Sequence, residues 1–264
     1  MKKDKEEKPK MYIASCSFGK DSIATILLAL EHNEPLDRVV FSEVMFDHEK
    51  GISGEIPEHI EWVYKVAIPK LESMGVKIDV VRGKKDYKYF FINKLQGRGG
   101  KVKYEGKLYG FPIGGMCVIN RDCKTRPIKN YYRQFREQYD IIQYVGIAVD
   151  EPIRLKRLKK GQVSLLEKYG YTEIMAYELC KDYELLSPLY ENGDRGGCWF
   201  CPNGKLKQFI HLRKHHPDMW NDLRELSKTP NLCSYGFKYG KTLQEVEKEM
   251  DAYELNEKLQ LRLF

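Results

Sequence analysis

The feature that most constrains this chain is an apolar run followed by a glycine-containing turn and a helical stretch near its start. Met11–Cys16 is short and apolar, which predicts a buried strand. Ser17–Lys20 forms the turn, and Asp21–Glu31 carries apolar side chains at helical spacing. The three segments together predict a strand–loop–helix unit.

The same alternation continues along the chain. Further strands are predicted at Val39–Phe46, Val76–Val81 and Asp140–Val149, and helices at Pro57–Ser73 and Ile128–Gln138. Strands separated by helices favour a parallel sheet joined by right-handed crossovers. We therefore expect an α/β protein whose parallel, Rossmann-like sheet is flanked by helices.

The remaining segments suggest how the chain is divided. Residues 1–10 carry charges of both signs and predict a disordered tail, and residues 11–202 hold the expected α/β domain. Lys94–Gly115 is rich in glycine and lysine, which favours a loop or β-hairpin insertion that could act as a lid. Helical patterns in 206–216, 219–227 and 243–261 predict a helical C-terminal extension over 203–264.

Composition excludes several classes of protein. The chain has no uninterrupted apolar stretch of ~18 residues, so no membrane span is expected. The first ten residues contain no apolar segment of the kind found in signal peptides, and we expect a cytoplasmic protein. The net charge of +7 suits anionic ligands such as nucleotides, and also nucleic acid.

The loop between the first strand and first helix has the chemistry of an anion site. Gly19 lets the backbone approach a phosphate, and Ser17 and Ser22 offer hydroxyl groups. The helix start presents free N–H groups and the positive end of the helix dipole, and Lys20 adds a charge. The alternative is a helix start capped by Ser and Asp that binds no ligand.

This loop also carries a family resemblance. Residues 17–22 read Ser-Phe-Gly-Lys-Asp-Ser, which resembles the S-[FG]-G-x-D-S signature of PP-loop ATP pyrophosphatases, also called adenine nucleotide α-hydrolases. The form of the match points to the phosphoadenosine phosphosulfate (PAPS) reductase-like family. The resemblance covers residues 11–202 and implies a HUP-type sheet that binds ATP or PAPS with Mg²⁺.

Two further segments match the same family. Asp47 follows the second predicted strand, and Pro57-Glu58 opens the next helix. Residues 146–154 read Gly-Ile-Ala-Val-Asp-Glu-Pro-Ile-Arg and are similar to the family pattern G-I-R-x-D-E-x-x-R, with Ala148 at the place of the first Arg.

The resemblance assigns roles to these residues. It implies catalytic roles for Lys20, Asp21 and Asp47. It implies ATP or phosphate contacts for a larger set: Ser15, Ser17, Phe18, Gly19, Lys20, Asp21, Ser22, Gly146, Asp150, Glu151 and Arg154. The alternatives are a solvated loop acid for Asp47 and a salt-bridged turn for Asp150, Glu151 and Arg154.

Cysteines point to a metal centre. An odd count of seven in a reducing compartment argues against a disulfide framework. Cys198 and Cys201 have the C-x-x-C spacing of half a metal site or of a redox dithiol. By the resemblance, Cys123 and Cys117 complete a [4Fe–4S] site, although five residues separate that pair; zinc and inert buried thiols are the alternatives.

Basic residues cluster beside Cys123 and again after Arg154. Arg121, Lys124 and Arg126 form a patch suited to sulfate, phosphate or a nucleic-acid backbone. The run from Arg154 to Lys160 is either a solvated helix face or a stretch that faces an anion, RNA or DNA.

Three functions follow. The first is an enzyme that cleaves ATP between its α- and β-phosphates, adenylates a substrate and supports sulfur transfer from a sulfur donor. The second is a reductase of PAPS or of its analogue lacking the 3′-phosphate, ranked lower because the family's Glu-Cys-Gly-[IL]-His motif is absent. The third is a nucleotide- or nucleic-acid-binding module without turnover. The resemblance also implies a homodimer.

Overall fold

The computed structural model describes residues 8–96, 104–112, 117–192 and 196–260. Its chain divides into two compact units, and each is assembled from three separate stretches. Unit 1 comprises residues 1–43, 55–83 and 124–196, and unit 2 comprises residues 44–54, 84–123 and 197–264. The boundary near residue 202 stays a prediction, as does the tail over 1–10, most of which lies outside the described residues.

Unit 1 is built on a parallel sheet of five strands in the spatial order β5-β2-β1-β6-β7. The strands are β1 (Lys10–Cys16), β2 (Arg38–Glu43), β5 (Ile78–Arg82), β6 (Asp140–Tyr144) and β7 (Gln162–Val163). With β1 at the centre and the chain order reversing beside it, this is a doubly wound arrangement. The expected α/β architecture with a parallel, Rossmann-like sheet is confirmed.

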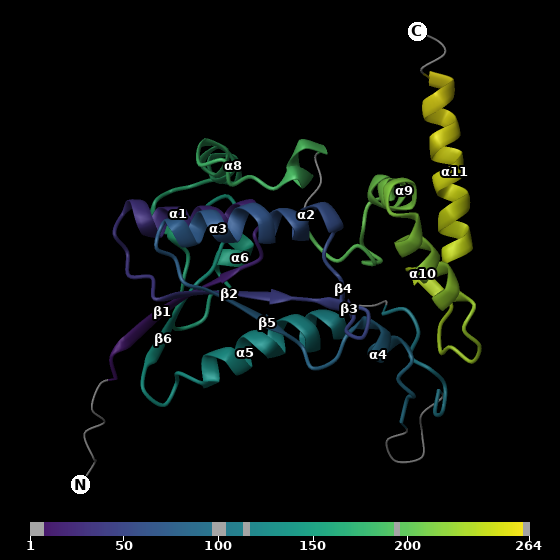
Figure 1. The fold of residues 1–264 in the computed structure, drawn as a ribbon, viewed down its shortest axis with the longest axis horizontal. Coiled ribbons are helices and arrows are strands. Elements are labelled where there is room, and N and C mark those ends of the chain that lie inside the picture. The colour runs from purple at the N-terminus through teal and green to yellow at the C-terminus, as the bar shows by residue number, and fades with distance from the viewer. Residues whose placement is uncertain (1–7, 97–103, 113–116, 193–195, 261–264) are drawn as a thin grey trace. The chain divides into compact units, whose positions relative to one another are not determined.

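Helices cover both faces of this sheet (Figure 1). Those of unit 1 are α1 (Lys20–Glu31), α2 (Pro57–Trp62), η1 (Val63–Ala67), α3 (Ile68–Ser73), α5 (Arg126–Arg133), α6 (Pro152–Leu155), α7 (Leu165–Lys168), α8 (Glu173–Asp182) and η3 (Pro188–Asn192). Figure 1 shows α1 and α3 on one face and α5 on the other.

The alternation of β1 explains this layering. Ala14 and Cys16 point into the larger apolar core with α1, whereas Met11 and Ile13 pack with Tyr131 of α5. A strand that is buried on both faces consists of consecutive apolar residues, and β1 could be predicted from this pattern.

The second predicted strand, Val39–Phe46, was wrong in its extent. β2 ends at Glu43, and the following residues form β3 (Met45–Asp47), which pairs antiparallel with β4 (Ile52–Ser53) in unit 2. The apolar run continues through Val44–Phe46 because these residues are buried in a second core. Hydropathy alone does not reveal where a chain leaves one core for another.

Unit 2 holds the remaining elements. They are β3, β4, α4 (Tyr87–Phe91), most of η2 (Asn120–Thr125), α9 (Leu206–His215), α10 (Pro217–Ser227), β8 (Gly236–Lys238), β9 (Lys241–Thr242) and α11 (Leu243–Gln260). The three C-terminal helices confirm the helical pattern predicted there. Lys94 pairs antiparallel with Leu108, in agreement with a hairpin insertion, although 97–103 and 113–116 lie outside the described residues.

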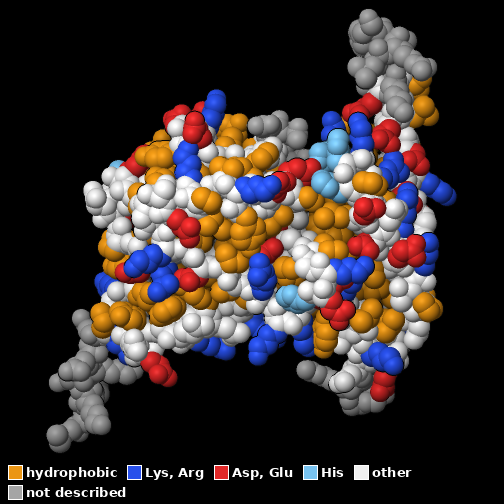
Figure 2. All heavy atoms as spheres, in the orientation of Figure 1, with side chains coloured by type: hydrophobic (Ala, Val, Ile, Leu, Met, Phe, Trp, Pro, Cys, Tyr) orange, Lys and Arg blue, Asp and Glu red, His pale blue; other side chains and the backbone are white. Residues whose placement is uncertain are grey.

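Charges of both signs intermingle on the face drawn in Figure 2, as the modest net charge leads one to expect. Within the described residues, no helix is both long enough and apolar enough to cross a membrane.

Candidate nucleotide site and cysteine cluster

The predicted phosphate loop lies at the carboxyl end of the central strand. It connects β1 to α1, and β1 is flanked by β2 on one side and β6 on the other. Chain order reverses at this point of the sheet, and ligands of doubly wound sheets bind outside the strand ends at such a reversal. The topology therefore places Ser17–Ser22 where a nucleotide is expected.

Side chains inside the loop fix its shape. The Ser22 hydroxyl donates to the carbonyl of Gly19 over 2.9 Å and accepts the amide proton of Ser17 over 3.2 Å. Phe18 has a φ of 55°, a conformation unusual for a residue with a side chain, and its ring is fully buried edge-on against Phe41. Burial of this ring offsets the backbone strain, so the loop is shaped before any ligand arrives.

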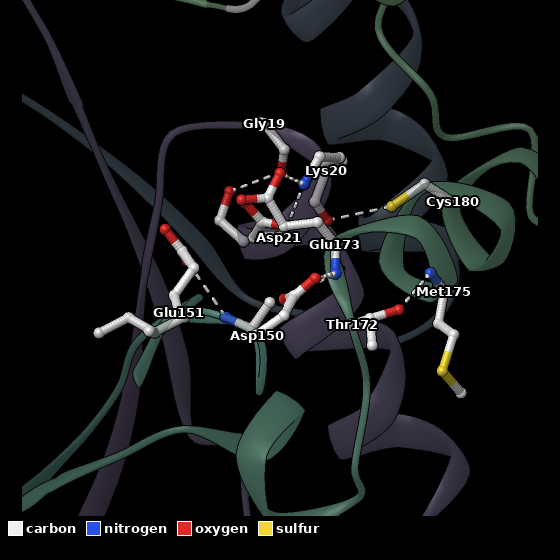
Figure 3. A network of polar contacts seen from close by, with 12 residues as sticks. Gly19, Lys20, Asp21, Asp150, Glu151, Thr172, Glu173, Met175 and Cys180 are labelled. Carbon is white, nitrogen blue, oxygen red and sulfur yellow. Dashed lines mark hydrogen bonds and ion pairs between the residues drawn. The ribbon is translucent and has the colours of Figure 1, made fainter. Parts of the chain in front are cut away.

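Lys20 is shared between two carboxylates (Figure 3). Its Nζ lies 2.7 Å from Asp21 Oδ1 and 3.1 Å from Glu173 Oε2 at the start of α8. Burial acts to lower the pKa of Lys20, but the two carboxylates outweigh it and raise that pKa. Burial raises the pKa of Asp21, and Lys20 offsets this only in part. One cation between two acids leaves a site that would gain from a second cation.

Some backbone groups at the start of α1 are bonded to side chains, and others have no partner in the described chain. The amide of Lys20 donates to the Tyr190 hydroxyl over 3.0 Å, and its carbonyl accepts from the Cys180 thiol over 3.2 Å. The amides of Gly19 and Asp21 donate to no other group in the described chain. Those two N–H groups, together with the exposed Ser17 side chain, can therefore receive an anion.

His59 supports the loop from α2, and sequence reasoning did not single it out. Its Nε2 lies 3.2 Å from the carbonyl oxygen of Ser17, and its Nδ1 lies 2.9 Å from the Ser187 hydroxyl. Burial, followed by the charge of Lys124, lowers the pKa of His59, which favours the neutral ring. The only signal in the sequence was its position directly after Pro57-Glu58.

Gly146 lies against the start of α1. A Cβ atom at this position would come within 2.7 Å of the backbone carbon and oxygen of Asp21 and 2.8 Å of the Ser22 amide nitrogen. Real Cβ atoms essentially never make such contacts with backbone. Glycine therefore lets the segment just after β6 approach the Ser17–Ser22 loop closely, while the contact of Gly146 with ATP stays a proposal.

Asp150, Glu151 and Arg154 are engaged with protein groups. The Asp150 carboxylate accepts the amide proton of Glu173 at the start of α8, over 3.2 and 3.3 Å (Figure 3). Arg154 Nη1 lies 2.5 Å from Glu151 Oε1, and Glu151 also accepts from the Ala148 amide. In this arrangement the salt-bridged turn forms, and Arg154 would have to leave Glu151 to reach a phosphate.

Asp47 belongs to unit 2 and is not a solvated loop acid. Its buried carboxylate lies 2.8 Å from Lys88 Nζ and accepts the amide proton of Lys50. Burial acts to raise the pKa of Asp47, but the hydrogen bonds from Lys88 and Lys50, with the Lys88 charge, outweigh it and lower that pKa. The carboxylate is therefore held ionised.

Ser15 and the basic patch occupy different surroundings. Ser15 Oγ lies 2.6 Å from the hydroxyl of Tyr132 in α5 and accepts from Gln143. Lys124 is half-buried; its charge only partly opposes the burial that raises the pKa of Cys16 to about 11, and it adds to the burial that lowers the pKa of His59. Arg121 is exposed and paired with Asp122 at 2.6 Å, and Arg126 is exposed. The three residues are thus not equivalent as anion ligands.

All four cysteines predicted as metal ligands lie in unit 2: Cys117, Cys123, Cys198 and Cys201. Trp199 docks the C-x-x-C knuckle on β4, because its amide donates to Gly54 and its ring N–H donates to Ser53. No three sulfurs of these described cysteines lie mutually within 4.8 Å. A tetrahedral zinc with Zn–S bonds of 2.3 Å would draw them to about 3.8 Å.

Tyr87 lies close enough to three of these cysteines for their charge to affect its hydroxyl. Its hydroxyl is buried without a hydrogen-bond partner in the described structure. Burial raises its pKa strongly, and the nearby thiols of Cys117, Cys198 and Cys201 add to that rise. The ring packs on Phe46 and Phe200. A buried hydroxyl without a hydrogen-bond partner in the described chain can donate to a bound group that offers acceptor atoms.

Two curated proteins are similar to this chain over most of its length. No family model matches the chain. Two proteins of Methanocaldococcus jannaschii, each named as uncharacterized, are similar: MJ0066 is 26% identical over 251 residues and MJ0973 is 23% identical over 232 residues. These matches cover 90% and 81% of this chain, but 46% and 47% of the relatives. The chain thus spans about half the length of the curated relatives it matches.

One solved structure is also similar at a low level. It is the U34-tRNA thiolase NcsA from Methanococcus maripaludis with its [4Fe-4S] cluster, at 17% identity and a TM-score of 0.39. The match covers 90% of this chain and 78% of that one.

Proposed function

We propose that this chain binds ATP at the Ser17–Ser22 loop and cuts it between the α- and β-phosphates. A nucleophilic oxygen of the acceptor would attack the α-phosphorus and form an acceptor–AMP ester. The bond from the α-phosphorus to its bridging oxygen would break, and pyrophosphate would leave with the electron pair. A sulfur nucleophile at the oxidation level of sulfide would then displace AMP.

One observation carries this proposal. The loop lies at the reversal of strand order and leaves the amides of Gly19 and Asp21 and the Ser17 hydroxyl able to receive phosphate oxygens. The buried ring of Phe18 and the hydrogen bond from His59 fix the conformation of the loop, so its backbone needs little reorganisation when phosphate binds. Preorganised donors of this kind are suited to a polyphosphate.

Lys20 would stabilise charge on the departing pyrophosphate. It is already oriented by Asp21 and Glu173, and the excess of carboxylates there suits a divalent cation. Mg²⁺, when bound with ATP, would supply Lewis-acid stabilisation of the same charge. Asp21 is the carboxylate of unit 1 proposed to serve it, and the predicted catalytic role of Asp47, which belongs to unit 2, stays a separate proposal.

The cysteines of unit 2 are proposed to hold an iron–sulfur cluster rather than a single zinc. A cluster gives each thiolate its own iron and so accepts sulfurs that are farther apart than those on one ion. The unsatisfied Tyr87 hydroxyl beside three of the cysteines supports a group with sulfide acceptors. When bound, the cluster would supply an iron site for sulfur chemistry. Membership of the PAPS reductase-like family, a homodimer and a cytoplasmic location are further proposals.

The test uses ATP labelled at the α- or the γ-phosphate, with Mg²⁺ and anaerobically purified full chain, and water takes the place of the acceptor oxygen. AMP and pyrophosphate should form in equal amounts, and Lys20→Gln should lower the rate by about 100-fold or more. Lys181→Gln, at an exposed lysine of α8, is the matched control and should keep the rate. Formation of ADP would contradict the proposal. Release of sulfite from PAPS would favour the reductase, and ATP binding without turnover would favour a binding module.

A further inference from the structure

A cavity of 540 Å³ lies within unit 1, on the side of the sheet that carries α5. Ser15 of β1, Gln143 of β6 and Gln162 of β7 line it. Four cations also line it: Lys129, Arg136, Lys159 and Lys160. α5 packs against β2 and β5, so the cavity opens over the other half of the same sheet face. We refer to it as the basic pocket.

The strand residues of the basic pocket form a continuous hydrogen-bonded chain. The hydroxyls of Tyr132 and Ser15 are 2.6 Å apart, and Gln143 Nε2 donates to Ser15 Oγ over 3.0 Å. Gln162 Nε2 donates to Gln143 Oε1 over 2.9 Å, and the Lys159 amide donates to Gln162 Oε1 over 3.0 Å. The floor is therefore an ordered polar surface rather than an apolar face that awaits a helix.

Within the described residues, no carboxylate neutralises the cations of the pocket. No acidic residue lines the pocket, and none of the four cations forms an ion pair within the described chain. This differs from Lys20, which two carboxylates hold. Four like charges around one cavity repel one another, and bound anions would relieve that repulsion.

Basic charge continues beyond the pocket. α6 ends at Leu155, so Lys159 and Lys160 lie in the connection to β7 rather than on a helix face. Lys156 and Arg157 are exposed in the same connection. Lys and Arg side chains also gather beside α5 on the face drawn in Figure 2. A mononucleotide would cover only the pocket, whereas a chain of phosphates can follow the charge outward.

We propose that the basic pocket binds the phosphodiester backbone of a single nucleic-acid strand. The lysines and Arg136 would neutralise successive phosphates, and the Gln and Ser side chains would hydrogen-bond to sugar or phosphate oxygens. Ser15 is two residues before Ser17, so a strand in the pocket would lie near the base of the phosphate loop within the same unit. This inference does not depend on ATP cleavage.

The experiment measures fluorescence anisotropy of labelled 20-nucleotide RNA and DNA of one sequence, titrated with full chain at several salt concentrations. The test variant is Lys159→Gln/Lys160→Gln, and the control variant is Lys77→Gln/Lys181→Gln. The control removes the same charge from two exposed lysines that do not line the pocket. Two lost phosphate contacts should make the slope of log K against log salt shallower by about 1.4 and raise the Kd severalfold.

The outcomes separate the alternatives. Loss of RNA and DNA binding together supports a site for the shared backbone, and loss of RNA binding alone supports an RNA site. An equal effect of both double variants would overturn the proposal, as would a wild-type chain that binds neither strand at low salt. Loss of ATP or pyrophosphate binding with unchanged nucleic-acid binding would make the pocket a small-anion site and overturn it as well. AMP formation from ATP should be unchanged in the test variant. The binding assay therefore tests the basic pocket and the ATP assay tests the proposed function, and either proposal can fail without the other.

Discussion

The ring of His59 bridges the carbonyl oxygen of Ser17, at 3.2 Å, and the hydroxyl of Ser187, at 2.9 Å. A neutral ring can donate from Nε2 and accept at Nδ1 at the same time, whereas a protonated ring cannot accept. Burial lowers the pKa of His59 and so maintains that state. A side chain outside the signature sequence thus fixes the orientation of the first residue that would contact phosphate.

Removal of this support should weaken ATP binding. His59→Ala is expected to raise the Kd for ATP about fivefold, because a net hydrogen bond contributes ~1 kcal/mol. Isothermal titration calorimetry with ATP and Mg²⁺ measures it. His215→Ala, at an exposed position of α9, is the control. Equal affinities for the His59 variant and the wild type would show that the loop does not need the bridge.

The lowered pKa of His59 also predicts the direction of a pH effect. An unfolded histidine takes up a proton as the pH falls below about 6.5, whereas the buried ring in the folded state takes it up only at lower pH. Its contribution to stability is therefore present above about pH 6.5 and is lost as the pH falls toward the folded-state pKa.

Thermal unfolding from pH 8 to pH 5 tests this expectation. The Tm of the wild type should fall more over this interval than that of His59→Gln, which has no ring to protonate. Parallel Tm curves for the two proteins would mean that another group governs acid stability.

Gly146→Ala tests the close approach of β6 to the loop. The added methyl group would meet backbone atoms of Asp21 at 2.7 Å, so the start of α1 must move. We expect a loss of about 1–3 kcal/mol in the free energy of unfolding and a larger proportional loss of ATP affinity. Denaturant titration and calorimetry measure the two effects. Gly197→Ala is the control, because a Cβ there meets open space.

Metal analysis tests the proposed cluster. Anaerobically purified chain should contain iron and acid-labile sulfide and show a broad visible absorbance, and Cys198→Ser should remove most of each. Cys233→Ser should retain them, since its thiol donates to the carbonyl of Tyr109 and is not among the proposed ligands. About one zinc per chain and no colour would instead make the knuckle a structural zinc site.

Tyr87→Phe removes the hydroxyl but keeps the ring, so it measures what the hydroxyl alone contributes to stability. The ring supplies the packing on Phe46 and Phe200, whereas the hydroxyl is buried and unsatisfied. In metal-free protein the variant should be more stable by about 1 kcal/mol, because an unsatisfied buried group costs ~1–3 kcal/mol. In metal-loaded protein the gain should disappear or reverse. A loss of stability in the metal-free form would show that the hydroxyl already has a partner.

The sequence was informative where chemistry is local. The unit of β1, its following loop and α1 could be predicted, because a strand, a turn and a helix start are encoded by neighbouring residues. The binding of phosphate by this loop stays a proposal. The cysteine knuckle was equally visible from its spacing. Each of these predictions required only a few residues close together in the sequence.

The second layer of the site could not be predicted in this way. The loop is contacted by three residues that are distant in the sequence. These are His59 of α2, Tyr190 of η3 and Cys180 of α8, and each contacts the loop through a single hydrogen bond. The short β7 and the helix α8 were also missed, since β7 spans two residues and α8 has a weak apolar pattern. Partners that lie 40 to 170 positions apart leave no periodic signal in a single sequence.

The stretches of the two units alternate along the chain, and this arrangement affects both proteolysis and evolution. The chain passes between them after residues 43, 54, 83, 123 and 196, so no single cut releases either one intact. Unit 2, which bears the cysteines, could therefore not have been gained or lost through one insertion or deletion at an end of the chain. Truncation after residue 196 would remove Cys198 and Cys201 but would leave Cys117 and Cys123 in the chain, together with two of the three stretches of unit 2.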